Sequence, residues 1–257
     1  MRHVRMIFSS DLQAAADELV KWICNDAGKR AMVIAPYRAI DERWRRAVSA
    51  LGNGCSVSIV RGTAKEKNIT ICMNAQIIFV SPGGAEKILR NRDIKTDILI
   101  ADDLESLIGI REKNKKSISA IAHDTTQIIG ISCGLKKEYL RYVPEAFRIL
   151  GMDKMKGMSP NGFYERFYYR NYIKKGKDTI CRLELKPGAF EAVKKLLGEI
   201  CDMQMLGKEE KADRDMSGYE EYIPLDYKEK SKYRFIKRLQ EAGSNGNGIG
   251  YHNGQFV

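Results

Sequence analysis

The chain has 257 residues, enough for one domain with a sizeable core, and its 44 Lys and Arg against 33 Asp and Glu give a net charge of +11. This charge favours an acidic partner, most simply a nucleic acid backbone, although a basic surface that only maintains solubility would look the same. Three histidines argue against a zinc site or a histidine-based triad. No apolar run reaches transmembrane length and no signal peptide is recognisable, so we expect a cytoplasmic protein that does not bind membranes.

The six cysteines are scattered along the chain, and no two have the spacing of a metal-binding or redox pair. Most of them lie in apolar runs. This pattern predicts small core residues in a reducing compartment, without disulfides or metal ligands. They are Cys24, Cys55, Cys72, Cys133, Cys181 and Cys201.

The first half of the chain alternates between helical spacing and short apolar runs. Residues 11–25 have the period of an amphipathic helix, and Ala31–Ala35 is an apolar run that Pro36 closes, as in a buried parallel strand. The remaining patterns predict strands at 56–60, 76–80, 97–101 and 127–132, and helices at 40–51, 84–91 and 113–123.

This alternation predicts an α/β fold with a mostly parallel sheet and helices on both faces. The strand ends at Pro36, Asp102-Asp103 and Cys133-Gly134 would then line one edge of the sheet. Ligands of open α/β sheets bind at this carboxyl edge.

Beyond residue 135 the pattern becomes helical and aromatic. We expect an α/β core over 1–135, a helical and aromatic extension of the same lobe over 136–242, and a flexible Gly/Asn-rich tail over 243–257. Within the extension the patterns predict helices at 138–150, 187–203 and 227–239, an aromatic segment at 162–172, a strand at 180–185, a charged loop at 207–219 and a short extended piece at 222–225.

The order of these motifs resembles the first RecA-like lobe of Swi/Snf-type (superfamily-two) helicase-like ATPases, in particular the short versions carried by phages. Val33-Ile34-Ala35-Pro36 with Trp44, the acidic segment Ile98–Glu105 and the TGTP-like segment Ile129–Leu135 occur in the family's order. The resemblance covers about residues 8–240. It implies a single RecA-like (P-loop-NTPase-like) lobe with a helical C-terminal extension.

The chain departs from the family where the nucleotide should bind. A phosphate loop ends in Gly-Lys-Ser/Thr, because backbone N–H groups hold the phosphates and the lysine neutralises their charge. The corresponding segment, Phe8–Ala15, has no glycine and no lysine, and it contains the carboxylate of Asp11. We expect this carboxylate to repel a triphosphate.

The acidic motif has also changed. Asp102 matches the aspartate on the magnesium side, but Asp103 replaces a glutamate whose side chain reaches farther by about 1.5 Å. Leu104-Glu105 replaces an Ala-His pair. After residue 240 we expect only a tail, without the second lobe that supplies an arginine finger. We therefore interpret Asp102 and Asp103 as a vestigial or merely solvated strand end, with a live metal site as the alternative.

Candidate binding residues follow the same edge. Tyr37, Arg38 and Arg61 lie where the family's lobe contacts a DNA backbone, and Ser81 follows the next strand. An ordinary exposed loop is the alternative. Basic residues that could contact a backbone, or only form a solvated face, are Lys113, Lys115, Lys116, Lys136 and Lys137. The aromatic segment 162–172 is typical of a core, but Arg166 and Arg170 interleave with it, as in a base-stacking platform.

These features together predict a catalytically inactive helicase-like binding module of phage or mobile-element origin, without a cofactor. It would bind nucleic acid, most simply DNA, or dock on a larger complex such as a helicase, nuclease or defence effector, including as an inhibitor of host defence. One alternative is the first lobe of a split DNA-dependent ATPase that another chain completes, with ATP and Mg²⁺ as cofactors. The other is a protein–protein adaptor without a nucleic-acid role.

Overall fold

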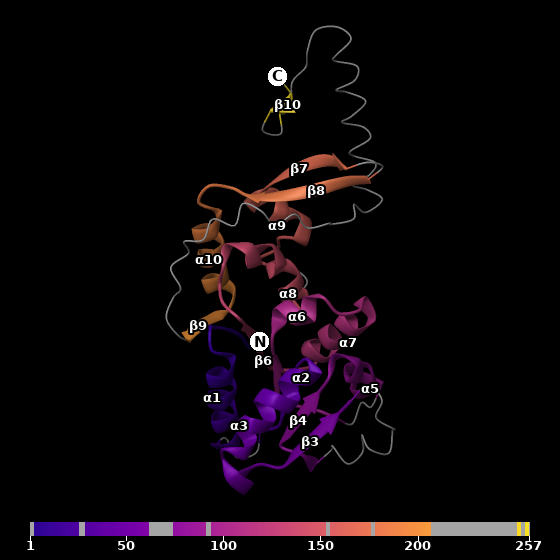
Figure 1. Ribbon diagram of the computed structural model, residues 1–257, viewed down its shortest axis with the longest axis vertical. Helices are drawn as coiled ribbons and strands as arrows, with labels where there is room; N and C mark the ends of the chain where they lie inside the picture. The colour runs from indigo at the N-terminus through magenta and orange to yellow at the C-terminus, as the bar shows by residue number, and fades with distance from the viewer. Residues whose placement is uncertain are drawn as a thin grey trace. The chain divides into compact units, whose positions relative to one another are not determined.

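The computed structural model contains a parallel sheet of seven strands, in the order β3-β4-β2-β5-β6-β1-β9 (Figure 1). The structure describes residues 3–25, 29–61, 74–90, 94–152, 155–175, 178–206, 251–252 and 255–256. The strands of the sheet are β1 (His3–Ser9), β2 (Ala31–Ile34), β3 (Val57–Val60), β4 (Ile77–Val80), β5 (Ile98–Ala101), β6 (Gln127–Ser132) and β9 (Asp202–Leu206). The predicted α/β class with a parallel sheet is confirmed.

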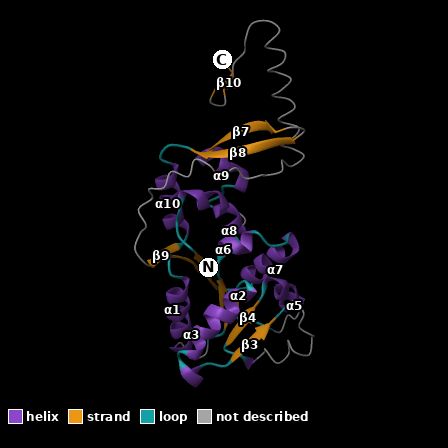
Figure 2. Cartoon of the chain, in the orientation of Figure 1, coloured by secondary structure: helices purple, strands orange, loops and turns teal. Residues whose placement is uncertain are grey.

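Helices cover both faces of this sheet (Figure 2). On one face lie α1 (Leu12–Asn25), α2 (Tyr37–Ala39), the π-helix η1 (Ile40–Trp44), α3 (Arg45–Ser49) and the 3₁₀ turn η2 (Gly52–Gly54). The layer on the other face contains η4 (Pro82–Gly84), α5 (Ala85–Arg90), α6 (Leu104–Ile108), α7 (Glu112–His123), η5 (Lys137–Tyr142) and α8 (Val143–Ile149). Gly130 of β6 allows α6 and α8 to approach, since a Cβ there would lie 2.6 Å from the Met6 sulfur and 3.0 Å from Leu104.

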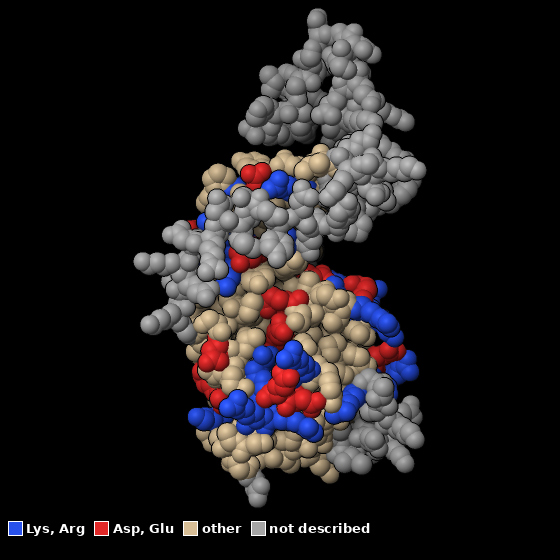
Figure 3. All heavy atoms as spheres, viewed as in Figure 1, with Lys and Arg blue, Asp and Glu red and all other residues tan. Residues whose placement is uncertain are grey.

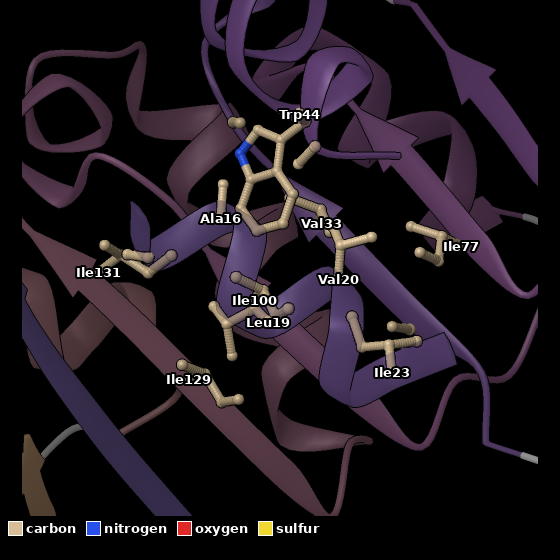
Figure 4. Close-up of a cluster of buried hydrophobic side chains, with 14 of the residues drawn as sticks. Ala16, Leu19, Val20, Ile23, Val33, Trp44, Ile77, Ile100, Ile129 and Ile131 are labelled. Carbon is tan, nitrogen blue, oxygen red and sulfur yellow. The ribbon is translucent and has the colours of Figure 1, made fainter. Parts of the chain in front are cut away.

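The core on the α1 side contains the indole of Trp44 together with side chains of α1 and of the middle strands (Figure 4). Trp44 is fully buried, its ring centroid lies 6.0 Å from that of Phe79, and it is surrounded by side chains from α1 and from the middle strands. All four residues of β2, β4 and β5 are buried, which explains why these strands appear in the sequence as continuous apolar runs. Trp44, which the family resemblance singled out, is thus a core residue.

Two strands of the sheet were not predicted. β1 contains His3 and Arg5, and β9 begins at Asp202, where the predicted helix 187–203 was expected to continue. The helix α10 (Ala189–Ile200) ends earlier because the chain from Asp202 onward pairs in parallel with β1. Polar contacts between these two strands, His3 with Asp202 and Arg5 with Gln204, account for the polar residues that obscured their pattern.

The predicted helical extension contains a β-hairpin. After α9 (Pro160–Phe167) the chain forms β7 (Tyr168–Lys175), which pairs antiparallel with β8 (Asp178–Leu185). The chain divides into two compact units: the described parts of 1–167 and 187–213 belong to the unit with the sheet, and the hairpin belongs to the other. The aromatic segment 162–172 is therefore split, since α9 ends at Phe167 and the strand begins at Tyr168.

Part of the predicted tail is paired. Tyr251–His252 (β10) forms an antiparallel pair with Gln255–Phe256 (β11). The predicted loop at 207–219, extended piece at 222–225 and helix at 227–239 lie outside the described residues, as do residues 243–250. None of the helices in the described ranges could span a membrane.

The prediction that all cysteines are unpaired is wrong for two of them. Cys24 near the end of α1 forms a disulfide with Cys55, which precedes β3, and their Cα atoms are 5.9 Å apart. The two residues are 31 positions apart, and they come together because both pack against the same core of buried residues. The cysteine content therefore no longer supports a reducing compartment. Cys133, Cys181 and Cys201 are free thiols.

Candidate functional site

The carboxyl ends of the parallel strands meet at one edge of the sheet. The register places Ile34 of β2 beside Val80 and Ala101, and Phe8 of β1 beside Ser132. The loops after these strands therefore share this edge, as the sequence predicted for Pro36, Asp102-Asp103 and Cys133-Gly134. They divide into two groups by what their polar side chains contact.

The loop after β1 is held by hydrogen bonds within itself. The hydroxyl of Ser9, a buried residue, donates to the carbonyl oxygen of Asp11 at 2.7 Å and accepts from its backbone N–H at 3.1 Å. The Asp11 carboxylate accepts hydrogen bonds of 3.0 Å from the N–H groups of Gln13 and Ala14 in the first turn of α1. A phosphate at a helix N-terminus would need these same donors.

Asp102, after β5, points into the protein. It is completely buried, and its Oδ2 accepts from the indole N–H of Trp44 at 2.6 Å and from the guanidinium of Arg43 at 2.5 Å. Burial raises the pKa of Asp102, while Arg43 and Trp44 oppose this rise. The interpretation of Asp102 as a solvated strand end is therefore wrong. The buried Oδ1 has no hydrogen-bond partner among the described residues.

Asp103, the next residue, caps a helix. Its φ of 55° places it in the left-handed region, and its carboxylate accepts from the Ser106 N–H at 3.3 Å and hydroxyl at 2.7 Å in the first turn of α6. An aspartate tolerates this backbone conformation better than most residues. Capping α6 is thus a structural role for Asp103. This role accounts for the residue without assuming that it orients a water molecule for catalysis.

Glu105 of α6 connects the acidic segment to the end of β6. Its carboxylate accepts from the Ser132 hydroxyl and from the Cys133 N–H, the latter at 3.4 Å. Burial, with Glu105 nearby, raises the pKa of the Cys133 thiol to about 11, so this thiol is protonated at neutral pH. An apolar cavity of about 30 Å³ adjoins this contact and is lined in part by Phe8 and Tyr139. Such a volume admits one or two water molecules but no nucleotide.

The ends of β2 and β3 carry a different set of side chains, which we call the Tyr37–Arg61 patch: Tyr37, Asp41, Arg45 and Arg61. The Arg61 guanidinium lies 4.4 Å from the centroid of the Tyr37 ring, which is 42% exposed. The Asp41 carboxylate lies 3.3 Å from Arg45 and 4.0 Å from Arg61, and its hydrogen bond with Tyr37 raises the pKa of that phenol. The patch thus presents two arginines and an aromatic ring to solvent. Figure 3 shows basic and acidic side chains interleaved on the face that carries α2 and α3.

Arg38 and Ser81 flank this patch without belonging to it. Arg38 donates to both carboxylate oxygens of Glu42, at 2.9 and 3.0 Å, and its side chain is 85% exposed. Ser81 is only 9% exposed, and its N–H donates to the Val60 carbonyl at 3.1 Å. A Cβ at Gly84 would lie 2.7 Å from the same carbonyl oxygen, so the turn after β4 packs closely against the end of β3. Ser81 therefore supports the strand end from which Arg61 projects.

The other candidate residues lie apart from the patch. Lys136 and Lys137 lead into η5, and Lys137 is exposed. Two other lysines of the predicted basic set form ion pairs, Lys113 with Glu86 at 3.7 Å and Lys115 with Glu145 at 2.7 Å. The predicted basic cluster is thus partly neutralised.

Arg166 and Arg170 are divided between the two units. Arg166 lies in the last turn of α9, with its guanidinium 5.3 Å from the Phe167 ring, and Arg170 lies on β7. Phe163 and Phe167 are buried, which confirms the core interpretation for these two rings. Tyr169, by contrast, is 44% exposed.

Two residues that distinguish the two groups, Arg43 and Asp41, were not among the candidates predicted from the sequence. A local signal existed for Asp41, because Tyr37, Asp41 and Arg45 recur every four residues and so share one helical face. No local signal joined Arg43 to Asp102, which lies 59 positions away.

No protein-family model matches the chain, and neither does any curated protein. Solved structures do. The Sulfolobus solfataricus SWI2/SNF2 ATPase core domain matches 96% of this chain with 49% of its own, at 13% identity and a TM-score of 0.57. The same ATPase core in complex with dsDNA matches 96% of this chain with 50% of its own, at 12% identity and a TM-score of 0.51.

At these identities the likeness concerns the fold. The chain has the α/β fold of a RecA-like helicase lobe, and it spans about half the length of the SWI2/SNF2 structures that it matches. The resemblance drawn from the order of motifs is confirmed at this level.

Proposed function

We propose that this protein is a helicase-like lobe that binds nucleic acid, most simply DNA, without turning over ATP. It would need neither ATP nor Mg²⁺. The main support for the proposal is that the Asp11 carboxylate accepts hydrogen bonds from the N–H groups of Gln13 and Ala14. An ATPase of this fold would hold phosphate at this position.

The nucleotide side of the edge is occupied by the protein's own groups. A triphosphate would have to displace a carboxylate that already satisfies the α1 N-terminus, and no lysine is present there to neutralise its charge. Asp102, the residue that would face a magnesium ion, is used by Arg43 and Trp44 in the interior. These contacts support a structural role for residues that are catalytic in an ATPase.

The β2 and β3 side of the edge supports binding. Arg61 is about half exposed and lies against an exposed tyrosine, a combination suited to phosphate contact and base stacking. The net charge of +11 adds long-range attraction to a polyanion. One of the similar structures is a complex with dsDNA, which agrees with this assignment.

Salt-dependent binding of a labelled duplex by the full chain tests the nucleic-acid part of the proposal. We expect the logarithm of the affinity to fall with the logarithm of salt concentration by about 0.9 per phosphate contact. Arg61→Gln should reduce this slope, while Lys21→Gln, which removes an exposed charge on α1, should not. Binding without salt dependence, or no binding at low salt, would overturn this part.

Thermal unfolding with millimolar MgATP tests the other part. A ligand present at 100 times its dissociation constant stabilises the folded state by about 2.7 kcal/mol, which would raise the melting temperature measurably. We expect no shift. A clear shift together with DNA-stimulated hydrolysis would instead favour the first lobe of a split ATPase.

We further propose that the protein docks on a larger nucleic-acid enzyme, and that it is encoded by a phage or mobile element and can act as an inhibitor of host defence. A helicase-like lobe that does not hydrolyse ATP could occupy the binding site of an active helicase lobe in such a complex. Affinity purification from the native host at two salt concentrations, with and without nuclease, tests this. A partner that survives nuclease supports docking, and its absence contradicts it.

A further inference from the structure

The β7–β8 hairpin is the most basic described segment outside the sheet unit. Residues 168–186 contain six Lys or Arg and two Asp or Glu, a net charge of +4 over 19 residues, whereas the whole chain has +11 over 257. The hairpin belongs to a different compact unit from the Tyr37–Arg61 patch. It is therefore a separate surface from the one in the proposed function.

Strand pairing assigns the side chains of the hairpin to two faces. Tyr168 lies opposite Leu185 and Tyr172 opposite Cys181 on one face, and Tyr168 and Cys181 are each only 5% exposed. The alternating positions point the other way. On that second face Tyr169 lies opposite Glu184 and Asn171 opposite Arg182, and Ile173 follows at the next alternating position of β7.

The second face is open and carries an aromatic ring beside cations. Tyr169 is 44% and Ile173 is 42% exposed, and the Lys186 ammonium lies 5.4 Å from the Tyr169 ring centroid. Arg182 is exposed. The one carboxylate at the centre of this face, on Glu184, accepts a 3.0 Å hydrogen bond from Asn171.

We propose that this face, formed by Tyr169, Ile173, Arg182 and Lys186, binds single-stranded nucleic acid. A base stacks on the Tyr169 ring, and Lys186 and Arg182 contact the flanking phosphates. Aromatic rings next to basic side chains bind single strands without sequence preference, because every unpaired base has a π-face. In a duplex these faces are stacked inside the helix, so the contact selects for unpaired bases.

Fluorescence anisotropy of a labelled oligothymidylate of roughly 15 nucleotides, within the site sizes known for such proteins, tests the stacking contact on the full chain. Tyr169→Ala should weaken binding about 5- to 150-fold, since one stacked base contributes that much. Tyr169→Phe keeps the ring and should bind as the unchanged protein does. Binding of a blunt duplex of the same length should not respond to Tyr169→Ala. Unchanged oligothymidylate binding in Tyr169→Ala, or an equal loss on the duplex, would overturn the inference.

Salt titrations separate this surface from the sheet edge. Arg182→Gln and Lys186→Gln should each reduce the salt slope on the oligothymidylate by about 0.7, whereas Lys21→Gln should leave it unchanged. If Arg61→Gln weakens duplex binding but the hairpin variants change nothing, the hairpin inference fails and the proposed function stands. If the hairpin variants respond and Arg61→Gln does not, the hairpin contact stands and the edge assignment fails.

Discussion

The two ends of the carboxyl edge differ in what their polar side chains do. At β1, β5 and β6 the carboxylates of Asp11, Asp102 and Glu105 are all used by the protein's own donors. At β2 and β3, Tyr37 and Arg61 project to solvent and contact each other. Loops at the same edge of a sheet therefore need not share a function, because binding a partner needs side chains that the protein's own contacts leave accessible.

A single π-helix connects the two ends. η1 directs Arg43 and Trp44 inward to Asp102, and Asp41 toward the arginines of the Tyr37–Arg61 patch. π-helical turns occur frequently at functional sites. The interior contacts of η1 therefore position the Tyr37–Arg61 patch. A substitution that breaks the contacts with Asp102 should also change the position of Asp41 in the patch.

The largest expected effect comes from Asp102→Ala. The substitution leaves the Arg43 guanidinium and the Trp44 indole N–H without their buried acceptor. Breaking a buried ion pair by removing one partner costs about 3–5 kcal/mol. Urea unfolding followed by fluorescence should show a correspondingly lower midpoint.

Asp103→Asn is the matched control for that measurement. Asparagine can keep the cap on α6 and tolerates the left-handed backbone conformation. The free energy of unfolding should therefore change by less than about 0.5 kcal/mol. Equal stability of Asp102→Ala and the unchanged protein would show that Asp102 is not structural, and would reopen the metal-site interpretation.

Removing the Cys24–Cys55 disulfide should have the next largest effect. The bond joins Cys24 of α1, the helix that follows β1, to Cys55, which precedes β3, and the two residues are 31 positions apart in the sequence. Cys24→Ser with Cys55→Ser should lower the free energy of unfolding by about 2–4 kcal/mol under oxidising conditions. Under reducing conditions the variant and the unchanged protein should unfold alike, and a difference there would point to packing instead of the bond.

Asp11→Ala should have a smaller effect. It removes the carboxylate that caps α1, and the loss of such a cap costs about 0.5–2 kcal/mol. Asp11→Asn retains an acceptor oxygen and should recover most of this free energy in the same denaturation measurement. If Asp11→Ala proves as stable as the unchanged protein, the loop after β1 does not depend on this contact. The carboxylate of Asp11 would then no longer distinguish the β1 side of the edge from the β2 and β3 side.

The smallest effect on stability is expected for Arg61→Gln, on the open side of the edge. Its contacts with Tyr37 and Asp41 are exposed, so the free energy of unfolding should change by no more than about 0.5 kcal/mol. Its effect should appear in duplex binding, as a salt slope lower by about 0.9. Arg38→Gln removes an equal charge from a pair with Glu42 and serves as the neighbouring comparison. A large loss of stability in Arg61→Gln would place this arginine with the structural groups of the other side.

Much of the fold could be predicted where a pattern is local. The runs of β2, β4 and β5 predicted buried strands because each is apolar throughout, and Phe8–Ala15 predicted a missing phosphate loop because that motif is contiguous. The prediction failed for β1 and β9, whose polar residues pair with each other across about 200 positions. In the hairpin, the predicted strand at 180–185 is confirmed as part of β8, but β7 was not predicted, because its aromatic residues showed no strand period.

The α/β class, the basic charge and the carboxylate in place of a phosphate loop depend on residue types and short-range order, so they can be predicted from the sequence. Which polar groups remain open to a partner depends on the tertiary structure. Asp102 and Arg61 both follow apolar strands, and no local feature separates them. Their difference depends on the neighbours that sheet order and helix packing bring to each: an indole and a guanidinium inside the protein for Asp102, and an exposed tyrosine for Arg61.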